Sequence, residues 1–352
     1  MPSLPTTTAG DAGHPVAQEM TIAIISTGGT FGMEDSARGL RPAPVAERID
    51  VLLRSPAIPG LTYTVAELAP QIDSANATPL AWQQIVDAIE ERYEDFDGFV
   101  VVHGTDTMAY SAAAVAYAFS DRRKPIVFTG AQRPLSSERS DGPLNLIGAI
   151  EHLMLTRPQT AEIYFGGVGM NGTRAVKYST MADRAFVSST TARVESGRTN
   201  SGVRPAVIRA IPPFGRYSDF EIPVVRVYPG ISARTLSAML GDVPAAVLEC
   251  YGYGNMPAAT PGLLDAIAAA SGRGQVIVAV SQCVEGRITL GASEVSTGLA
   301  EAGVIDGADL TTEAALAKLH YLFGCGLSAS EVRELVTIGL VGELTTRVDH
   351  PE

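Results

Sequence analysis

Cysteine is scarce in this chain, and so are the features of a secreted protein. The 352 residues include three cysteines, Cys250, Cys283 and Cys325, and none of them forms a C-x-x-C pair. An odd count at these spacings argues against a disulfide framework or a cysteine zinc site, and it predicts buried free thiols in a reducing compartment. The N-terminus has neither a basic start nor an apolar segment, so it does not resemble a secretory signal. We therefore expect a cytoplasmic location.

Positive charge and long apolar runs are scarce as well. Lys and Arg number 26 against 38 Asp and Glu, which gives a net charge of −12. Nucleic acids and anionic membranes both need a basic surface, so neither is expected as a partner. The sequence has no uninterrupted apolar run of about 18 residues, so no membrane span is predicted. A small anionic substrate remains compatible, because a local site can oppose the global charge.

Short apolar runs are what the chain does contain. Seven of them are typical of parallel strands with both faces covered: 21–25, 98–102, 125–129, 162–166, 223–228, 245–249 and 275–280. Helical patterns lie between these runs. Residues 80–95, preceded by Thr78 as the expected N-cap and Pro79, place their apolar side chains on one stripe, and residues 107–119 are nearly all apolar. This alternation predicts an α/β fold.

Prolines and a glycine interrupt the alternation in "RAIPPFGRYSDFEIP", residues 209–223. We predict a linker there, between a larger N-terminal parallel-sheet α/β domain over 20–208 and a smaller C-terminal α/β domain over 224–352. The composition of residues 1–19 predicts a disordered tail.

Two polar clusters follow predicted strands, where α/β sheets bind ligands. "STGGTFGM", residues 26–33, places Thr27 and Thr30 around two glycines, and it lacks the G-x-G-x-x-G or lysine of a phosphate-binding loop. "HGTDTMAY" begins at His103, which we expect to be a buried, hydrogen-bonded histidine. In the same stretch Thr105 and Asp106 either cap the next helix or serve a site.

Two further clusters lie in loops. In "IDSANATP", Asp73 could pair with a substrate ammonium and Ser74 could bond a substrate carboxylate, although the spacing alone favours a polar turn. In "GTRAVKYST", Lys177 is either an ordinary surface lysine or, beside a threonine and an aspartate, a group that accepts a proton.

Together these clusters resemble the bacterial L-asparaginases, in particular their cytoplasmic, type I branch. The similarity rests on "STGGTFGM", "HGTDTMAYSA", "TGAQRPLSSERSDGPLNL" and the Lys177 segment, in this order and spacing. It continues through "VYPGIS", "YGYGN" and "AGVIDGADLTTEAALAKLHYL", and so covers about residues 20–345. The resemblance implies two α/β domains, a homodimer or dimer of dimers with the site near a subunit interface, and no metal or organic cofactor.

The resemblance also implies a reaction, the hydrolysis of the side-chain amide of asparagine to aspartate and ammonia. Carried over by position, Thr30 matches the first nucleophile. Thr105, Asp106 and Lys177 match a second threonine and the pair that activates it. The order in which the two threonines act is left open.

The resemblance implies substrate contacts too. Asp73 and Ser74 match the residues that hold the α-amino and α-carboxyl groups, and Thr105 and Asp106 are also matched to substrate-binding residues. Gly29 and Thr105 match donors near the developing oxyanion, which commonly contribute about 10²–10³ in rate each.

One position departs from the family pattern. Leu40 stands where a tyrosine is expected on the loop after Thr30, and no tyrosine lies between Thr30 and Tyr63. A leucine cannot relay a proton. Three hypotheses therefore stay open: L-asparagine hydrolysis, hydrolysis of another amide such as D-asparagine, glutamine or a modified amino acid, and amino-acid binding without turnover.

Overall fold

The larger sheet has six strands in the order β4-β1-β5-β6-β7-β8, and all neighbours are parallel except β7 and β8. This computed structural model describes residues 19–37, 39–55, 57–189, 216–217 and 219–345. The strands of this sheet are β1 (Met20–Ser26), β4 (Leu61–Glu67), β5 (Gly98–Val102), β6 (Ile126–Thr129), β7 (Glu162–Phe165) and β8 (Val168–Asn171).

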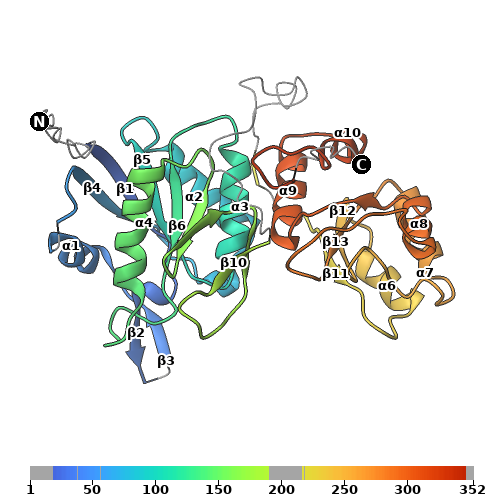
Figure 1. Ribbon diagram of the computed structural model, residues 1–352, viewed down its shortest axis with the longest axis horizontal. Coiled ribbons are helices and arrows are strands. Elements are labelled where there is room, and N and C mark those ends of the chain that lie inside the picture. Colours follow the sequence, from blue (N-terminus) through green and yellow to red (C-terminus); the bar gives the residue numbers. More distant parts are fainter. Residues whose placement is uncertain (1–18, 38, 56, 190–215, 218, 346–352) are drawn as a thin grey trace, which may run out of the picture.

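Helices cover both faces of this sheet (Figure 1). They are α1 (Ala46–Arg54), α2 (Pro79–Glu90), α3 (Met108–Ala118) and α4 (Gly142–Thr156). Successive side chains of a strand point to opposite faces, so in β1 Ile22 and Ile24 pack with α1 and α4, whereas Ala23 and Ile25 pack with α2 and α3. Two buried faces explain why the strands are apolar throughout.

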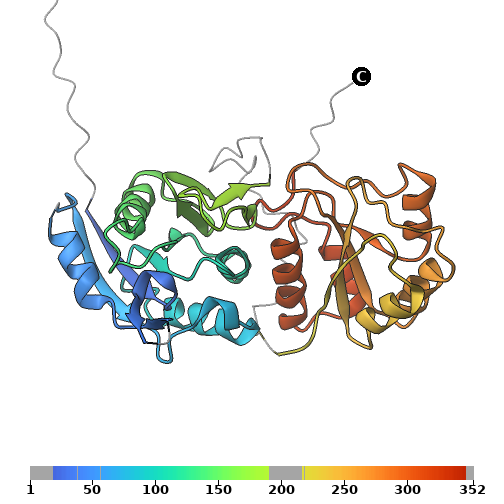
Figure 2. The ribbon, with the colours of Figure 1, turned by 90° about the horizontal axis from the view of Figure 1, so that it is seen from below.

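The smaller sheet is parallel, in the order β11-β12-β13-β14. Its strands and helices are β11 (Val224–Arg226), β12 (Ala245–Cys250), β13 (Val276–Ser281), β14 (Ile305–Asp306), α6 (Ala233–Leu240), α7 (Leu263–Gly272), α8 (Glu294–Glu301), α9 (Thr312–Gly324) and α10 (Ala329–Leu335). Figure 2 shows the two sheets in separate lobes, with α9 between them. Because α9 packs against both α3 and β12, one core runs from the first lobe into the second.

Short elements complete the fold. They are two antiparallel hairpins, β2 (Met33–Ser36) with β3 (Gly39–Pro42) and β9 (Ala175–Lys177) with β10 (Phe186–Ser188), and the 3₁₀ turns η1 (Thr30–Gly32) and η2 (Ser74–Asn76). The β2–β3 hairpin projects from the body of the molecule (Figure 1).

Buried charged groups join the lobes. The Arg174 guanidinium, just before β9, bonds the Asp309 carboxylate at 2.8 Å and the Gly342 carbonyl oxygen at 2.9 Å. Arg174 is 1% exposed. Close by, the Lys318 Nζ of α9 lies 2.7 Å from Glu343 Oε1, and both side chains are fully buried. The segment around residue 342 therefore contacts both the strand β9 region and the second lobe.

The structure confirms the predicted fold class, a larger N-terminal parallel-sheet α/β domain and a smaller C-terminal one. All seven predicted strands are present, with ends shifted by at most two residues. The helix predicted over 80–95 ends at Glu90, because Arg92 and Tyr93 form i→i−3 turns instead. The proposed tail, except residue 19, and most of the proposed linker lie outside the described residues, as does the boundary at 208.

One smaller expectation was wrong. Cys250 and Cys325 are buried and form no disulfide, as predicted, but Cys283 is exposed in the loop after β13. Thr78 is the N-cap of α2 and Pro79 its first residue, as predicted, although the Thr78 side chain makes no capping hydrogen bond. No helix within the described ranges is long and apolar enough to cross a bilayer.

Candidate active site

The carboxyl ends of β1 and β5 lie side by side, and the chain leaves them toward opposite faces of the sheet. The segment after β1 leads to α1, and the segment after β5 leads to α3 on the other face. In α/β sheets such a divergence is the usual ligand position, in the crevice outside the strand ends. The first two polar clusters occupy these two strand ends.

Glycines let three of the four clusters touch. Gly29 has a φ of +83°, and a Cβ on it would lie 2.3 Å from the Gly104 Cα. A Cβ on Gly104 would in turn lie 2.3 Å from Ser74 Oγ. Both distances are far below van der Waals contact, so only glycine fits at either position. The backbones carrying Thr30 and Thr105 therefore pack directly against each other.

The two threonines of the first cluster have different roles. Thr27 is buried, and both its N–H (2.9 Å) and its hydroxyl (3.2 Å) donate to the Val102 carbonyl. Its own carbonyl accepts from the Ile72 N–H at 2.6 Å. Thr27 thus fastens the loop to β5 and to the Asp73 segment. Thr30 opens η1 and is half-buried, so it is more accessible than Thr27.

The second and fourth clusters meet at the Lys177 ammonium group. Its Nζ lies 2.9 Å from Thr105 Oγ1 and 2.6 Å from Asp106 Oδ1. The Lys177 side chain is 20% exposed, whereas Asp106 is 60% exposed. The predictions of a surface lysine and of a helix cap were therefore wrong for these residues. Lys177 is not a free surface lysine, and neither Thr105 nor Asp106 caps α3, since the N-cap is Thr107.

The third cluster forms a turn that is tied to the start of α3. The Asp73 carboxylate accepts from the Ala75 N–H at 3.2 Å and from Asn76 Nδ2 at 3.0 Å, while its side chain stays exposed. Ser74 is buried, and its carbonyl accepts from the Thr107 hydroxyl at 2.8 Å. This bond ties the third cluster to the start of α3. The predicted polar turn is present, and it packs against the segment after β5.

His103 is a buried, hydrogen-bonded histidine, as predicted. Its Nδ1–H donates to the Gly104 carbonyl at 2.7 Å, and its Nε2 accepts from the Ser111 hydroxyl at 3.0 Å. Burial lowers the pKa of His103 to about 4, so the ring is neutral near pH 7. It supports the Thr105 loop and does not reach the crevice as a base.

Gln132 is a contact of the site to which the sequence analysis gave no role. It lies on the loop after β6, the strand next to β5, and its Oε1 is 3.3 Å from Thr105 Oγ1. The sequence did contain a signal for this residue, because Gln132 belongs to the "TGAQRP" stretch and follows the end of a predicted strand. Over the described part of the chain, no three His, Cys, Asp or Glu side chains gather closely enough to share a metal ion.

Fold and site together define a two-domain parallel α/β protein with an ion-paired lysine against a threonine hydroxyl at its strand ends. The family model for the asparaginase N-terminal domain matches residues 21–204, and the model for the glutaminase/asparaginase C-terminal domain matches residues 221–336. The chain therefore belongs to the asparaginase family, which confirms the resemblance.

Individual relatives are similar to this chain over nearly its whole length. L-asparaginase 1 of Escherichia coli K12 is 36% identical over 343 residues, which is 93% of this chain and 99% of that protein. The crystal structure of L-asparaginase I from Vibrio cholerae superposes with a TM-score of 0.79 at 35% identity, covering 93% of this chain and all of the other. The L-asparaginase of Thermococcus kodakarensis has a TM-score of 0.78 at 27% identity, with the same coverage.

Proposed function

We propose that the protein is an L-asparaginase that hydrolyses the side-chain amide of L-asparagine to L-aspartate and ammonia. Family membership supports the reaction class. The observation that carries the proposal for the site is the contact of Lys177 Nζ with both Thr105 Oγ1 and Asp106 Oδ1. A hydroxyl is a weak nucleophile at its free pKa, and an adjacent base is the usual way to activate it.

The proposed reaction has two halves. A threonine oxygen attacks the amide carbon, its proton passes to the neutral Lys177 amine, and donors such as the Gly29 N–H face the resulting oxyanion. The C–N bond breaks, the proton goes to the leaving nitrogen, and ammonia departs from an ester. Water then attacks the ester, which releases aspartate and restores the hydroxyl. Thr30 and Thr105 are the two candidate nucleophiles.

The same proposal assigns substrate contacts. The exposed Asp73 carboxylate is the proposed partner of an α-ammonium group, since opposite charges pair, and Asp106, which is bound to Lys177, is a second proposed substrate contact. Ser74 is the proposed contact of an α-carboxylate. We further propose a cytoplasmic homodimer or dimer of dimers, with the domain division in the 209–223 segment.

A substrate panel with threonine variants tests the function. We expect ammonia from L-asparagine, and a loss of at least ~10³-fold for Thr30→Ala and Thr105→Val. Thr156→Val is the matched control, because this exposed threonine bonds only its own helix. Parent-like turnover in Thr105→Val would refute the assignment of the site. If ammonia is released only from D-asparagine or glutamine, the second candidate function, hydrolysis of another amide, is favoured. That candidate is considered because Leu40, in β3, stands where a tyrosine is expected.

A further inference from the structure

One glutamine spans the two elements that carry the proposed hydroxyl and the proposed base. Gln132 Oε1 is 3.3 Å from Thr105 Oγ1, and Gln132 Nε2 is 3.2 Å from the Ser179 carbonyl oxygen, two residues after Lys177. A carbonyl oxygen only accepts, so the amide nitrogen must face Ser179 and the amide oxygen must face Thr105. The orientation of this amide is therefore set by chemistry.

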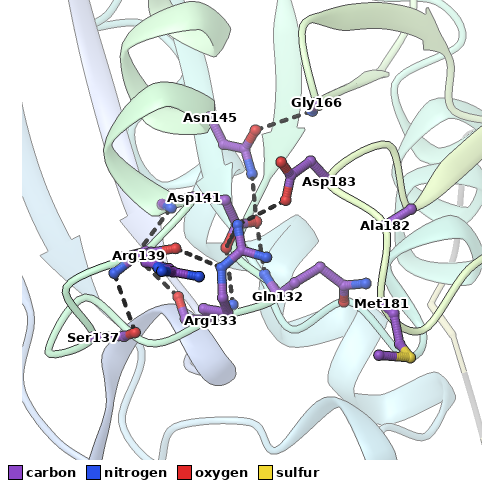
Figure 3. Close-up of polar contacts among 12 residues, drawn as sticks. Gln132, Arg133, Ser137, Arg139, Asp141, Asn145, Gly166, Met181, Ala182 and Asp183 are labelled. Atoms are coloured by element: carbon purple, nitrogen blue, oxygen red, sulfur yellow. Dashed lines mark hydrogen bonds and ion pairs between the residues drawn. The ribbon is translucent and has the colours of Figure 1, made fainter.

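A buried carboxylate holds Gln132 in place. Asp141 precedes α4 and is 6% exposed. Its carboxylate accepts from the Gln132 N–H and the Arg133 N–H, each at 2.9 Å, and from Asn145 Nδ2 at 3.1 Å. Figure 3 shows these bonds converging on the loop after β6. Backbone amides bound to a buried carboxylate leave the loop little freedom, so the Gln132 side chain starts from a fixed point.

The neighbouring Arg133 binds the turn between β9 and β10, to which Ser179 also belongs. Arg133 Nη2 lies 2.7 Å from Asp183 Oδ1, on the turn that follows β9 (Figure 3). Gln132 and Arg133 thus both reach the turn that leads from β9 back to β10. Because Lys177 is the last residue of β9, this loop sets the position of the strand end that carries it.

The bonds around the Thr105 hydroxyl determine where its proton points. Gln132 Oε1 can only accept, so Thr105 donates to it, and the free lone pair of Thr105 accepts from the Lys177 ammonium group. For proton transfer the hydroxyl must turn from Gln132 to a neutral Lys177. The Gln132 oxygen thus fixes the oxygen atom of Thr105 beside Lys177 in the resting enzyme.

We propose that Gln132 is a positioning residue, which holds the Thr105 hydroxyl against Lys177 by bridging it to the turn after β9. This inference rests on the proposed function. Gln132 acts through Thr105 and needs no contact with substrate.

Charges near Lys177 make the proposal testable through pH. Asp106, from the loop before α3, is the charged side chain in contact with Lys177 among the described residues. On the loop after β6, Arg133 is paired with Asp141 and Asp183. Gln132 itself is neutral. A carboxylate in its place would lie within about 6 Å of Lys177, close enough to favour the charged amine.

Two variants test the bridge in the full-length protein with L-asparagine. Gln132→Met keeps the length but has no amide, and we expect kcat to fall about 10-fold with KM changed less than about 3-fold. Gln132→Glu should move the acid limb of the kcat profile to higher pH by about one unit. The control is Gln159→Glu, an exposed glutamine that bonds the Arg157 carbonyl, which should leave both quantities unchanged.

The outcomes separate this inference from the proposed function. No ammonia from any amide with the parent protein refutes the function. An active parent with an unmoved acid limb in Gln132→Glu and an unchanged kcat in Gln132→Met overturns the inference alone. Crystal structures of Gln132→Met give a readout that needs no turnover. We expect the Thr105 hydroxyl or the turn after β9 to shift, and a retained Thr105–Lys177 contact would contradict the role.

Discussion

Replacing Lys318 by methionine tests an ion pair that is fully buried. The Lys318 Nζ lies 2.7 Å from Glu343 Oε1, and neither side chain is exposed. Burial lowers the pKa of Lys318 while the attraction of Glu343 opposes that shift. Burial alone would raise the pKa of Glu343, but the Lys318 charge and the N–H groups of Leu340 and Val341 bring it below its usual value. Each charge is therefore tolerated because the other is present.

The expected magnitude follows from this burial. Lys318→Met leaves a carboxylate with no counter-charge, and breaking a buried pair in this way costs about 3–5 kcal/mol of unfolding free energy. Adding Glu343→Gln removes the second charge and keeps an oxygen for the Leu340 N–H, so the double variant should lose less than about 2 kcal/mol. In the single variant the pKa of Glu343 rises above its unfolded value. The loss should then be small near pH 4 and grow as pH rises.

Urea denaturation at pH 5 and pH 8 measures these losses. The single tryptophan, Trp82, is a suitable probe because its ring packs 5.5 Å from His320, on the same helix as Lys318. Glu90→Gln is the control, since it breaks an exposed pair with Arg122 and should cost below about 1 kcal/mol. The reasoning fails if Lys318→Met costs less than 1 kcal/mol at pH 8, or if the double variant is no more stable than the single one.

Two further changes have expected outcomes. Gly29→Ala should reduce activity at least ~10²-fold because its Cβ would meet the Gly104 Cα, whereas Gly167→Ala, at the same φ of +83° but with open space around it, should keep parent activity in an ammonia assay. Burial lowers the pKa of His320 to about 4, so its contribution to stability is present above pH 6.5 and lost as pH falls toward 4. We expect urea titrations to show that the unfolding free energy of the parent is larger at pH 7 than at pH 4.5, and that His320→Gln reduces this difference by up to roughly 3 kcal/mol. An unchanged difference would contradict the buried histidine as its cause.

Strands with two buried faces were the most predictable part of the fold. The apolar runs at β1, β5 and β13 could be assigned because every side chain in them packs against something. The first two clusters could be assigned to strand ends for the same reason, but the pairing of β1 with β5 that sets them side by side was seen only in the structure. Family resemblance then supplied roles that spacing alone left open.

Elements with an exposed face were missed. The edge strand β4 alternates between half-buried and exposed residues and is rich in threonine, so it has no apolar run to mark it. β8 pairs antiparallel with β7, directly after a tight Gly166-Gly167 turn, which the pattern of parallel strands did not anticipate.

The distant partners of charged and polar side chains could not be predicted from the sequence either. Arg174 meets Asp309 across 135 positions, and Gln132 meets Ser179 across 47. Composition cannot reveal such partners, because an isolated arginine or glutamine is expected at the surface. Only the closed fold brings the two groups together.

The bonds from Arg174 to the segment around Gly342 have a consequence for protein engineering. Asn171, which ends β8, also donates from its Nδ2 to the Val341 carbonyl at 3.0 Å, so the last described stretch of chain is anchored to the lobe that holds Lys177. Deleting that stretch would remove the Gly342 carbonyl that accepts from Arg174 and the Glu343 carboxylate that pairs with Lys318. An affinity handle at the C-terminus should thus follow residue 345 and leave every residue up to it in place.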